Sequence, residues 1–88
     1  MKEDELNILK KLLDSLVDSS TKSNAQPLYN QLNNIAEDLT DRIKPNELTK
    51  LQEIIDLAKE ASGQVSHKEQ FRSNMKQRWT VFKRQVLT

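Results

Sequence analysis

The chain has 88 residues, a length typical of one domain, and its 14 Lys and Arg nearly balance its 13 Asp and Glu. It contains no Cys, which excludes disulfide bonds, thiolate zinc sites and cysteine nucleophiles. No apolar run approaches the roughly 20 residues that a membrane-spanning helix needs. The acidic start, residues 1–5, lacks the apolar stretch of a signal peptide. These features predict a small soluble protein of the cell interior.

Glycine and proline usage narrows the fold class. The chain has one Gly and two Pro, well below the average usage of about 7% and 5%. A sheet protein of this length needs many tight turns, which favour Asn-Gly or Asp-Gly pairs, and neither pair occurs. Leu, Lys, Gln and Glu, which are good helix formers, dominate instead. The composition therefore predicts an all-α fold.

The first predicted helix spans residues 2–18. Acidic side chains in its first turn complement the positive end of the helix dipole. The polar run from Asp18 to Asn24 contains no apolar residue and is predicted to be a loop. The apolar residues of the helix recur every three or four positions, which places them on one face: Leu6, Leu9, Leu13 and Leu16.

The second and third predicted helices span residues 25–44 and 47–62. Pro27 falls in the first turn of the second helix, where its missing N–H is not needed, and Pro45 is expected to end that helix by disfavouring helical geometry at Lys44. Asn46 is the expected N-cap of the third helix, and Gly63 is expected to end it in a left-handed conformation. The apolar stripes are Leu28, Leu32, Ile35, Leu39 and Ile43, then Leu48, Leu51, Ile54, Ile55, Ala58 and Ala61.

The fourth predicted helix spans residues 67–87. Ser66 and Glu69 have the spacing of a capping box, in which each side chain accepts a hydrogen bond from the other residue's amide. Because each helix has one apolar stripe and the loops are short, we expect an up-down-up-down antiparallel four-helix bundle, a single domain over residues 1–88. The apolar stripe of this helix is Phe71, Met75, Trp79, Phe82 and Val86.

Candidate catalytic and metal-binding groups are sparse in the sequence. The single imidazole, His67, falls in the first turn of a predicted helix without a nearby catalytic partner. Acidic pairs such as Glu37 with Asp38 suit a solvated helix face, and the Glu-x-x-His pattern of di-iron bundles does not occur. A single Gly cannot build a Gly-rich phosphate loop. We therefore predict a protein that is not an enzyme and that uses no cofactor or metal.

Charge is distributed unevenly along the chain. Residues 1–65 contain eight Lys and Arg against twelve Asp and Glu, whereas residues 66–88 contain six Lys and Arg against one acid, Glu69. At about 100° per residue, three of these cations fall within about 40° of one another, directly beside Trp79. These three residues, Arg72, Lys76 and Lys83, define a basic ridge on the last predicted helix.

Three interpretations of the basic ridge compete. In the first, the ridge is a solvated flank whose aliphatic stems cover the core, with Trp79 and Phe82 buried. In the second, it binds a partner protein or an anionic membrane face, where each cation contributes about 1 kcal/mol. In the third, it binds nucleic-acid phosphates. The third is disfavoured by the acidic remainder of the chain and by the lack of a helix-turn-helix pattern.

The order of the segments carries a family resemblance. A Leu-rich first helix runs into a polar loop over residues 12–22. The second helix contains a Tyr in the stretch 28–32, and a Pro-bearing turn leads into an amphipathic third helix over residues 45–57. A charged C-terminal segment follows. This layout, over nearly the whole chain, resembles the immunity proteins of pediocin-like (class IIa) bacteriocins, particularly the enterocin A immunity group.

The resemblance implies a cytoplasmic four-helix bundle that protects the bacteriocin-producing cell without catalysis. Such a protein would act at the inner face of the membrane, on a bacteriocin bound to membrane components of the mannose phosphotransferase system. In that family the C-terminal half sets which bacteriocin is recognised. The expected partner-binding residues are Arg72, Lys76, Arg78, Trp79, Lys83 and Arg84.

Two alternatives to an immunity function stay open. The chain could be a small regulatory adaptor or nucleic-acid-associated protein that binds through its basic C-terminal helix. It could also be a homo-oligomeric helical protein with no separate ligand.

Overall fold

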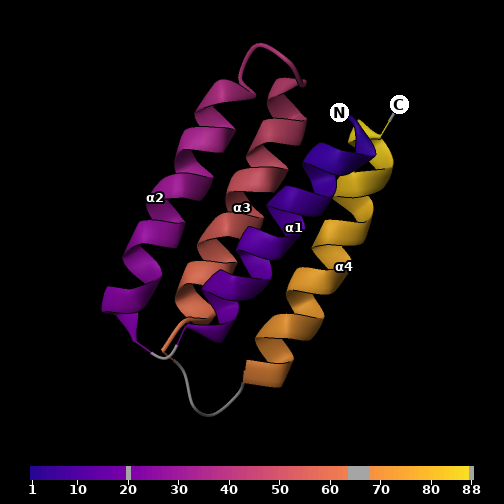
Figure 1. Cartoon of the computed structure of the whole chain (residues 1–88). Coiled ribbons are helices and arrows are strands. Elements are labelled where there is room, and N and C mark those ends of the chain that lie inside the picture. Colours follow the sequence, from indigo (N-terminus) through magenta and orange to yellow (C-terminus); the bar gives the residue numbers. More distant parts are fainter. Residues whose placement is uncertain (20, 64–67, 88) are drawn as a thin grey trace.

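The computed structural model describes residues 1–19, 21–63 and 68–87, which form four α-helices and no strand. The helices are α1 (Glu3–Asp18), α2 (Lys22–Asp38), α3 (Pro45–Ala61) and α4 (Lys68–Val86). Successive helices run in alternating directions (Figure 1). The predicted all-α fold with four helices is therefore confirmed. Within the described residues, no helix combines the length and apolar character that a membrane span requires.

The core lies between the apolar faces of all four helices. The four predicted leucines of α1 are buried, as are Leu32 of α2 and Phe82 of α4. Residues at the edges of the predicted stripes are partly buried and pack against this core, among them Leu28 and Phe71. The three- and four-residue spacing of the apolar side chains therefore identified the buried face of each helix.

The start of α2 corrects the predicted loop over residues 18–24. The helix begins at Lys22, earlier than the expected position 25, because the Thr21 hydroxyl accepts a hydrogen bond from the Asn24 amide at 3.1 Å. This side-chain cap satisfies one of the free amides of the first turn. Pro27 consequently lies inside α2, where it cannot donate to the carbonyl of Ser23.

The end of α2 also differs from the prediction. The helix ends at Asp38 instead of continuing to position 44. Beyond it the chain tightens into turns, in which the Arg42 and Ile43 amides both donate to the Leu39 carbonyl, at 2.9 and 3.1 Å. These turns end the helix before Pro45 is reached.

The start of α3 shifts the predicted N-cap by two residues. Lys44, and not Asn46, is the N-cap, and Pro45 is the first helical residue, where its fixed φ suits the helix. The Glu47 carboxylate accepts a hydrogen bond from the Lys44 amide at 2.9 Å. At the other end Gly63 has a φ of +77°, which confirms its predicted left-handed conformation. Ser66 and His67 fall outside the described residues, and with them the predicted Ser66–Glu69 capping box and the expected start of the last helix at 67.

The helices do not pack equally against one another. The most extensive interhelix packing joins α3 and α4, whereas α1 packs mainly against α2 and α3 and touches α4 at few positions. The ends of the described chain lie close together (Figure 1), and the Met1 amino group donates to the Val86 carbonyl at 2.7 Å. A groove lies between α1 and α4, and a smaller hollow lies on the surface between α3 and α4.

Candidate interaction surface on the C-terminal helix

The buried face of α4 includes Trp79. Its side chain is only 6% exposed, and its ring lies 5.7 Å from that of Phe82 at an interplanar angle of 42°. This tilted geometry is favourable for two aromatic rings. Of the six expected partner-binding residues, Trp79 is thus placed in the core, as the first interpretation of the ridge predicted. The exposed part of the candidate site consists of charged side chains.

On the side of α4 that faces α1, Arg72 forms ion pairs with two acidic side chains. Its guanidinium forms an ion pair with Asp18 at the end of α1, and a second one at 3.8 Å with Glu69 on its own helix. Lys76, one turn further along α4, is exposed and makes no ion pair among the described residues. The Arg72–Asp18 pair therefore closes one end of the α1–α4 seam and leaves Lys76 available.

The groove between α1 and α4 has a volume of about 520 Å³. The core residues among those that line it, Val17, Met75 and Trp79, are themselves nearly buried. Charged and polar side chains form its walls. The residues that line it are Lys10, Asp14, Val17, Asp18, Arg72, Met75, Lys76, Trp79 and Thr80.

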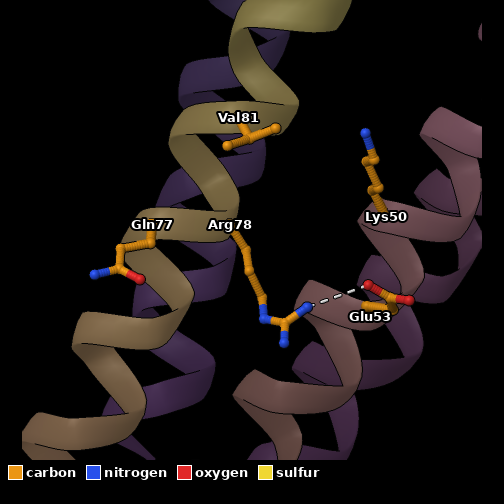
Figure 2. Close-up of a pocket in the computed structure, with 5 residues that line it drawn as sticks. All are labelled: Lys50, Glu53, Gln77, Arg78 and Val81. Atoms are coloured by element: carbon orange, nitrogen blue, oxygen red, sulfur yellow. Dashed lines mark hydrogen bonds and ion pairs between the residues drawn. The ribbon is translucent and has the colours of Figure 1, made fainter.

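On the opposite side of α4, Arg78 faces α3. Figure 2 shows its guanidinium directed toward Glu53, and the closest nitrogen–oxygen distance in this ion pair is 3.2 Å. Lys50, one turn earlier on α3, donates a hydrogen bond to the Gln85 amide oxygen at 2.9 Å. Between these contacts lies a hollow of about 260 Å³ beside Val81 (Figure 2).

Lys83 and Arg84 lie in the last turn of α4. Cations there interact favourably with the negative end of the helix dipole. Lys83 is half-buried and Arg84 is exposed, and neither makes an ion pair among the described residues. At about 100° per residue, Lys83 projects on the same side of the helix as Lys76. Arg84 projects about 80° away from Lys76 around the helix axis.

The six expected residues therefore do not form one surface. Trp79 is in the core, Arg78 is paired with Glu53 of α3, and Arg72 is paired with Asp18 of α1. The acidic partners Asp18 and Glu53 were not predicted as site residues. The local sequence carries no signal for them, because each lies 25 or more positions from its cation.

The described residues include no group of three or more His, Asp or Glu side chains that could hold a metal ion. The chain matches no family model, no curated protein and no solved structure.

Proposed function

We propose that this chain is an immunity-type protein that protects a bacteriocin-producing cell by non-catalytic binding at the cytoplasmic face of the membrane. Its partner would be a bacteriocin bound to membrane components of the mannose phosphotransferase system. The proposal combines the order of the sequence segments with one structural observation. Three of the five expected partner-binding cations make no ion pair among the described residues: Lys76, Lys83 and Arg84.

The binding free energy that these cations contribute decides what kind of binding they can support. Each Lys or Arg near an anionic membrane surface contributes about 1 kcal/mol, so three contribute about 3 kcal/mol, or roughly a hundredfold in affinity. That is enough to concentrate the protein at the inner leaflet but not to hold it there tightly. Specific protection therefore requires an additional contact with a protein partner.

The test is protection of a bacteriocin-sensitive strain that expresses the chain, challenged with a panel of pediocin-like peptides. The parent chain should protect against one or a few peptides. A triple variant, K76E/K83E/R84E, should lose that protection. Arg72 and Arg78 are left unchanged, because their reversal would set like charges against Asp18 and Glu53 and disturb the helix packing.

The matched control reverses three exposed lysines elsewhere, K2E/K11E/K22E, and so changes the net charge by the same amount. It should keep protection, and thermal melting should show that both triple variants are folded. Absence of protection by the parent chain across the panel would contradict the proposed function, and equal loss in both triple variants would contradict the role of α4.

Binding to nucleic acid tests the alternative function directly. If the three unpaired cations neutralised nucleic-acid phosphates, affinity should fall roughly fortyfold between about 50 and 200 mM salt, from a slope of about −0.9 per cation. Salt also weakens the attraction of the same cations to an anionic membrane surface, so protection in the expressing strain is the readout that separates the two functions. Nucleic-acid binding with the steep salt dependence, in the absence of protection, would support the alternative function.

A further inference from the structure

The hollow between α3 and α4, here the Val81 hollow, combines an exposed aliphatic side chain with a small volume. Val81 is 46% exposed, and Figure 2 shows it on α4 with Lys50 on α3 across the hollow. Most of the surface that lines the hollow is apolar, because the stems of long charged side chains add aliphatic surface to that of Val81. The volume of about 260 Å³ lies below the roughly 300–1,000 Å³ of sites that enclose a drug-sized molecule. The hollow therefore suits one side chain of a protein better than a cofactor.

The charged residues that line the Val81 hollow leave one cation unpaired. They are Lys50, Glu53 and Arg78. Glu53 and Arg78 pair with each other at 3.2 Å. The Lys50 ammonium group donates to the neutral Gln85 amide and makes no ion pair among the described residues. The lining therefore carries an excess of positive charge on its α3 side.

A second unpaired cation lies beside the hollow on α4. Arg84 follows Val81 by three positions, a spacing that makes two side chains neighbours on a helix surface. Arg84 is exposed and makes no ion pair in the part of the chain that the structure describes. The only acid of residues 66–88, Glu69, precedes Val81 by twelve positions, or about 18 Å along the helix axis. Val81 thus lies between two cations that no acid of α4 offsets.

The other acids of α3 are directed elsewhere. The buried Glu47 accepts a hydrogen bond from the Lys44 amide and lines a different hollow together with the Lys44 side chain. Asp56 faces α2, where it accepts a hydrogen bond from Tyr29. Glu60 lies seven positions beyond the acid that lines the Val81 hollow, about 10 Å along the axis, a separation at which salt largely screens exposed charges. The excess of positive charge around Val81 is therefore retained.

We propose that the Val81 hollow is a docking site for an acidic segment of a partner protein. An aliphatic side chain of that segment enters the hollow beside Val81, and carboxylates of the adjoining residues face Lys50 and Arg84. The apolar lining with a cation on either side carries this inference. Phosphates of a nucleic acid or of a membrane surface would satisfy the cations but leave the apolar lining unused, which favours a protein. The inference goes beyond the proposed function and is tested on the isolated chain.

The site can be tested by NMR titration of the isotope-labelled chain with a blocked Glu-Leu-Glu tripeptide. Peptide concentrations up to about 10 mM cover the weak affinity, a Kd of about 1 mM, expected for one anchored side chain. The amide resonances of Val81 and Lys50 should shift and reach saturation. Glu-Ser-Glu lacks the aliphatic side chain and Lys-Leu-Lys lacks the carboxylates, so each should bind at least about fourfold more weakly.

Two variants with matched controls assign the binding to the hollow. V81S should weaken binding of Glu-Leu-Glu at least about fourfold, the equivalent of one buried methylene group. K50Q should weaken it about two- to fivefold, as expected for an exposed ion pair. L87S and K11Q should bind as the parent does, because Leu87 is similarly exposed, at 42%, Lys11 is exposed, and neither lines the hollow. Circular dichroism checks the fold of each variant.

Three results would overturn the proposal: no saturable shift up to the highest peptide concentration, equal binding of the three peptides, or equal binding by V81S and L87S. Cosedimentation with phosphatidylglycerol vesicles tests the membrane as an occupant. If V81S reduces binding to these vesicles while the parent chain binds no peptide, the surface contacts anionic lipid and the proposal is wrong.

Discussion

Leu32 and Ile54 lie on adjacent helices, α2 and α3, and neither exposes any of its surface to solvent. Removal of a buried branched side chain costs both its transfer free energy and the cavity left behind. L32A and I54A should each lower the free energy of unfolding by roughly 2–5 kcal/mol, measured by urea denaturation. L87A, at an exposed position, should change it by less than about 0.5 kcal/mol. Unchanged unfolding of both core variants would contradict the assigned core faces.

Gly63 has a backbone conformation that glycine adopts readily and other residues adopt only with strain, and its surroundings are not crowded. A β-carbon at this position would meet only ordinary contacts, the nearest being 3.7 Å from Lys22, whereas the φ of +77° is unfavourable for other residues. G63V should therefore destabilise the chain by at least about 1–2 kcal/mol. G63N should cost less, since Asn tolerates this conformation better than a β-branched residue does. Equal thermal stability of G63V and the parent would show that the left-handed conformation is not required.

Glu5 connects stability to pH through its contact with Arg42. One guanidinium nitrogen of Arg42 lies 2.8 and 2.6 Å from the two carboxylate oxygens, and this hydrogen bonding holds the pKa of Glu5 below its ordinary value. A carboxylate with a lowered pKa stabilises the fold above its unfolded pKa, about 4.3, and this contribution disappears as the pH falls through the lowered value.

The pH dependence can be measured with one variant. R42A should be less stable than the parent near neutral pH, and the difference should shrink as the pH falls through the lowered pKa of Glu5, measured by urea denaturation at several pH values. K11A, which removes an exposed cation without an ion pair among the described residues, is the control. A pH-independent effect of R42A would contradict the coupling to Glu5.

At the scale of the helices, the capping residues decide where each helix begins. The polar run before α2 was predicted to be a loop because Ser, Thr and Asn compete with helical backbone hydrogen bonds. The same chemistry makes Thr21 an effective cap, so the helix begins inside that run. The identity of the residue that occupies the N-cap position cannot be chosen from composition alone.

T21A should therefore destabilise the chain by about 1 kcal/mol, whereas T21S, which keeps the hydroxyl, should be close to the parent. Hydrogen exchange provides a local measure, since the Asn24 amide donates to the Thr21 hydroxyl. Its exchange should accelerate in T21A more than that of amides in α3. Parent-like stability and exchange in T21A would place the start of α2 elsewhere.

A polar contact network joins α2 to α3 at the surface. The Lys59 ammonium group lies 4.0 Å from the centre of the Tyr29 ring, and the Tyr29 hydroxyl donates to Asp56 at 3.4 Å. Gln52 donates to the same Asp56 oxygen at 3.1 Å. Tyr29 therefore contacts a cation with its ring and donates a hydrogen bond with its hydroxyl group. These contacts join two helices that already share the core.

At the scale of the whole molecule, the acidic and basic parts of the sequence are partly neutralised by contact. Arg72 of α4 pairs with Asp18 of α1, and Arg78 pairs with Glu53 of α3. All four side chains in these pairs are substantially exposed, so each pair contributes at most about 1 kcal/mol to stability. Their larger effect is to reduce the charge that α4 presents to a partner.

Trp79 is the only tryptophan of the chain and reports on the packing of the whole molecule. Because it is buried between helices, its fluorescence emission should be blue-shifted, and acrylamide should quench it weakly. Unfolding followed by this emission should coincide with the loss of helical circular dichroism, as a cooperative transition requires. Emission typical of water-exposed tryptophan in the folded chain would show that Trp79 is exposed and belongs to the candidate interaction surface.

The sequence by itself determined the helical class, the buried face of each helix and the left-handed conformation of Gly63. These features depend on interactions between residues a few positions apart, which the spacing of Leu6, Leu9 and Leu13 already expresses. The apolar spacing made the core one of two interpretations for Trp79, and only the tertiary structure decided between the core and a partner surface. Only the tertiary structure showed that Arg72 and Arg78 are paired with acids. Those outcomes depend on which helices become neighbours and on the reach of long side chains between them. Contacts across 25 to 54 positions leave no local periodicity in the chain.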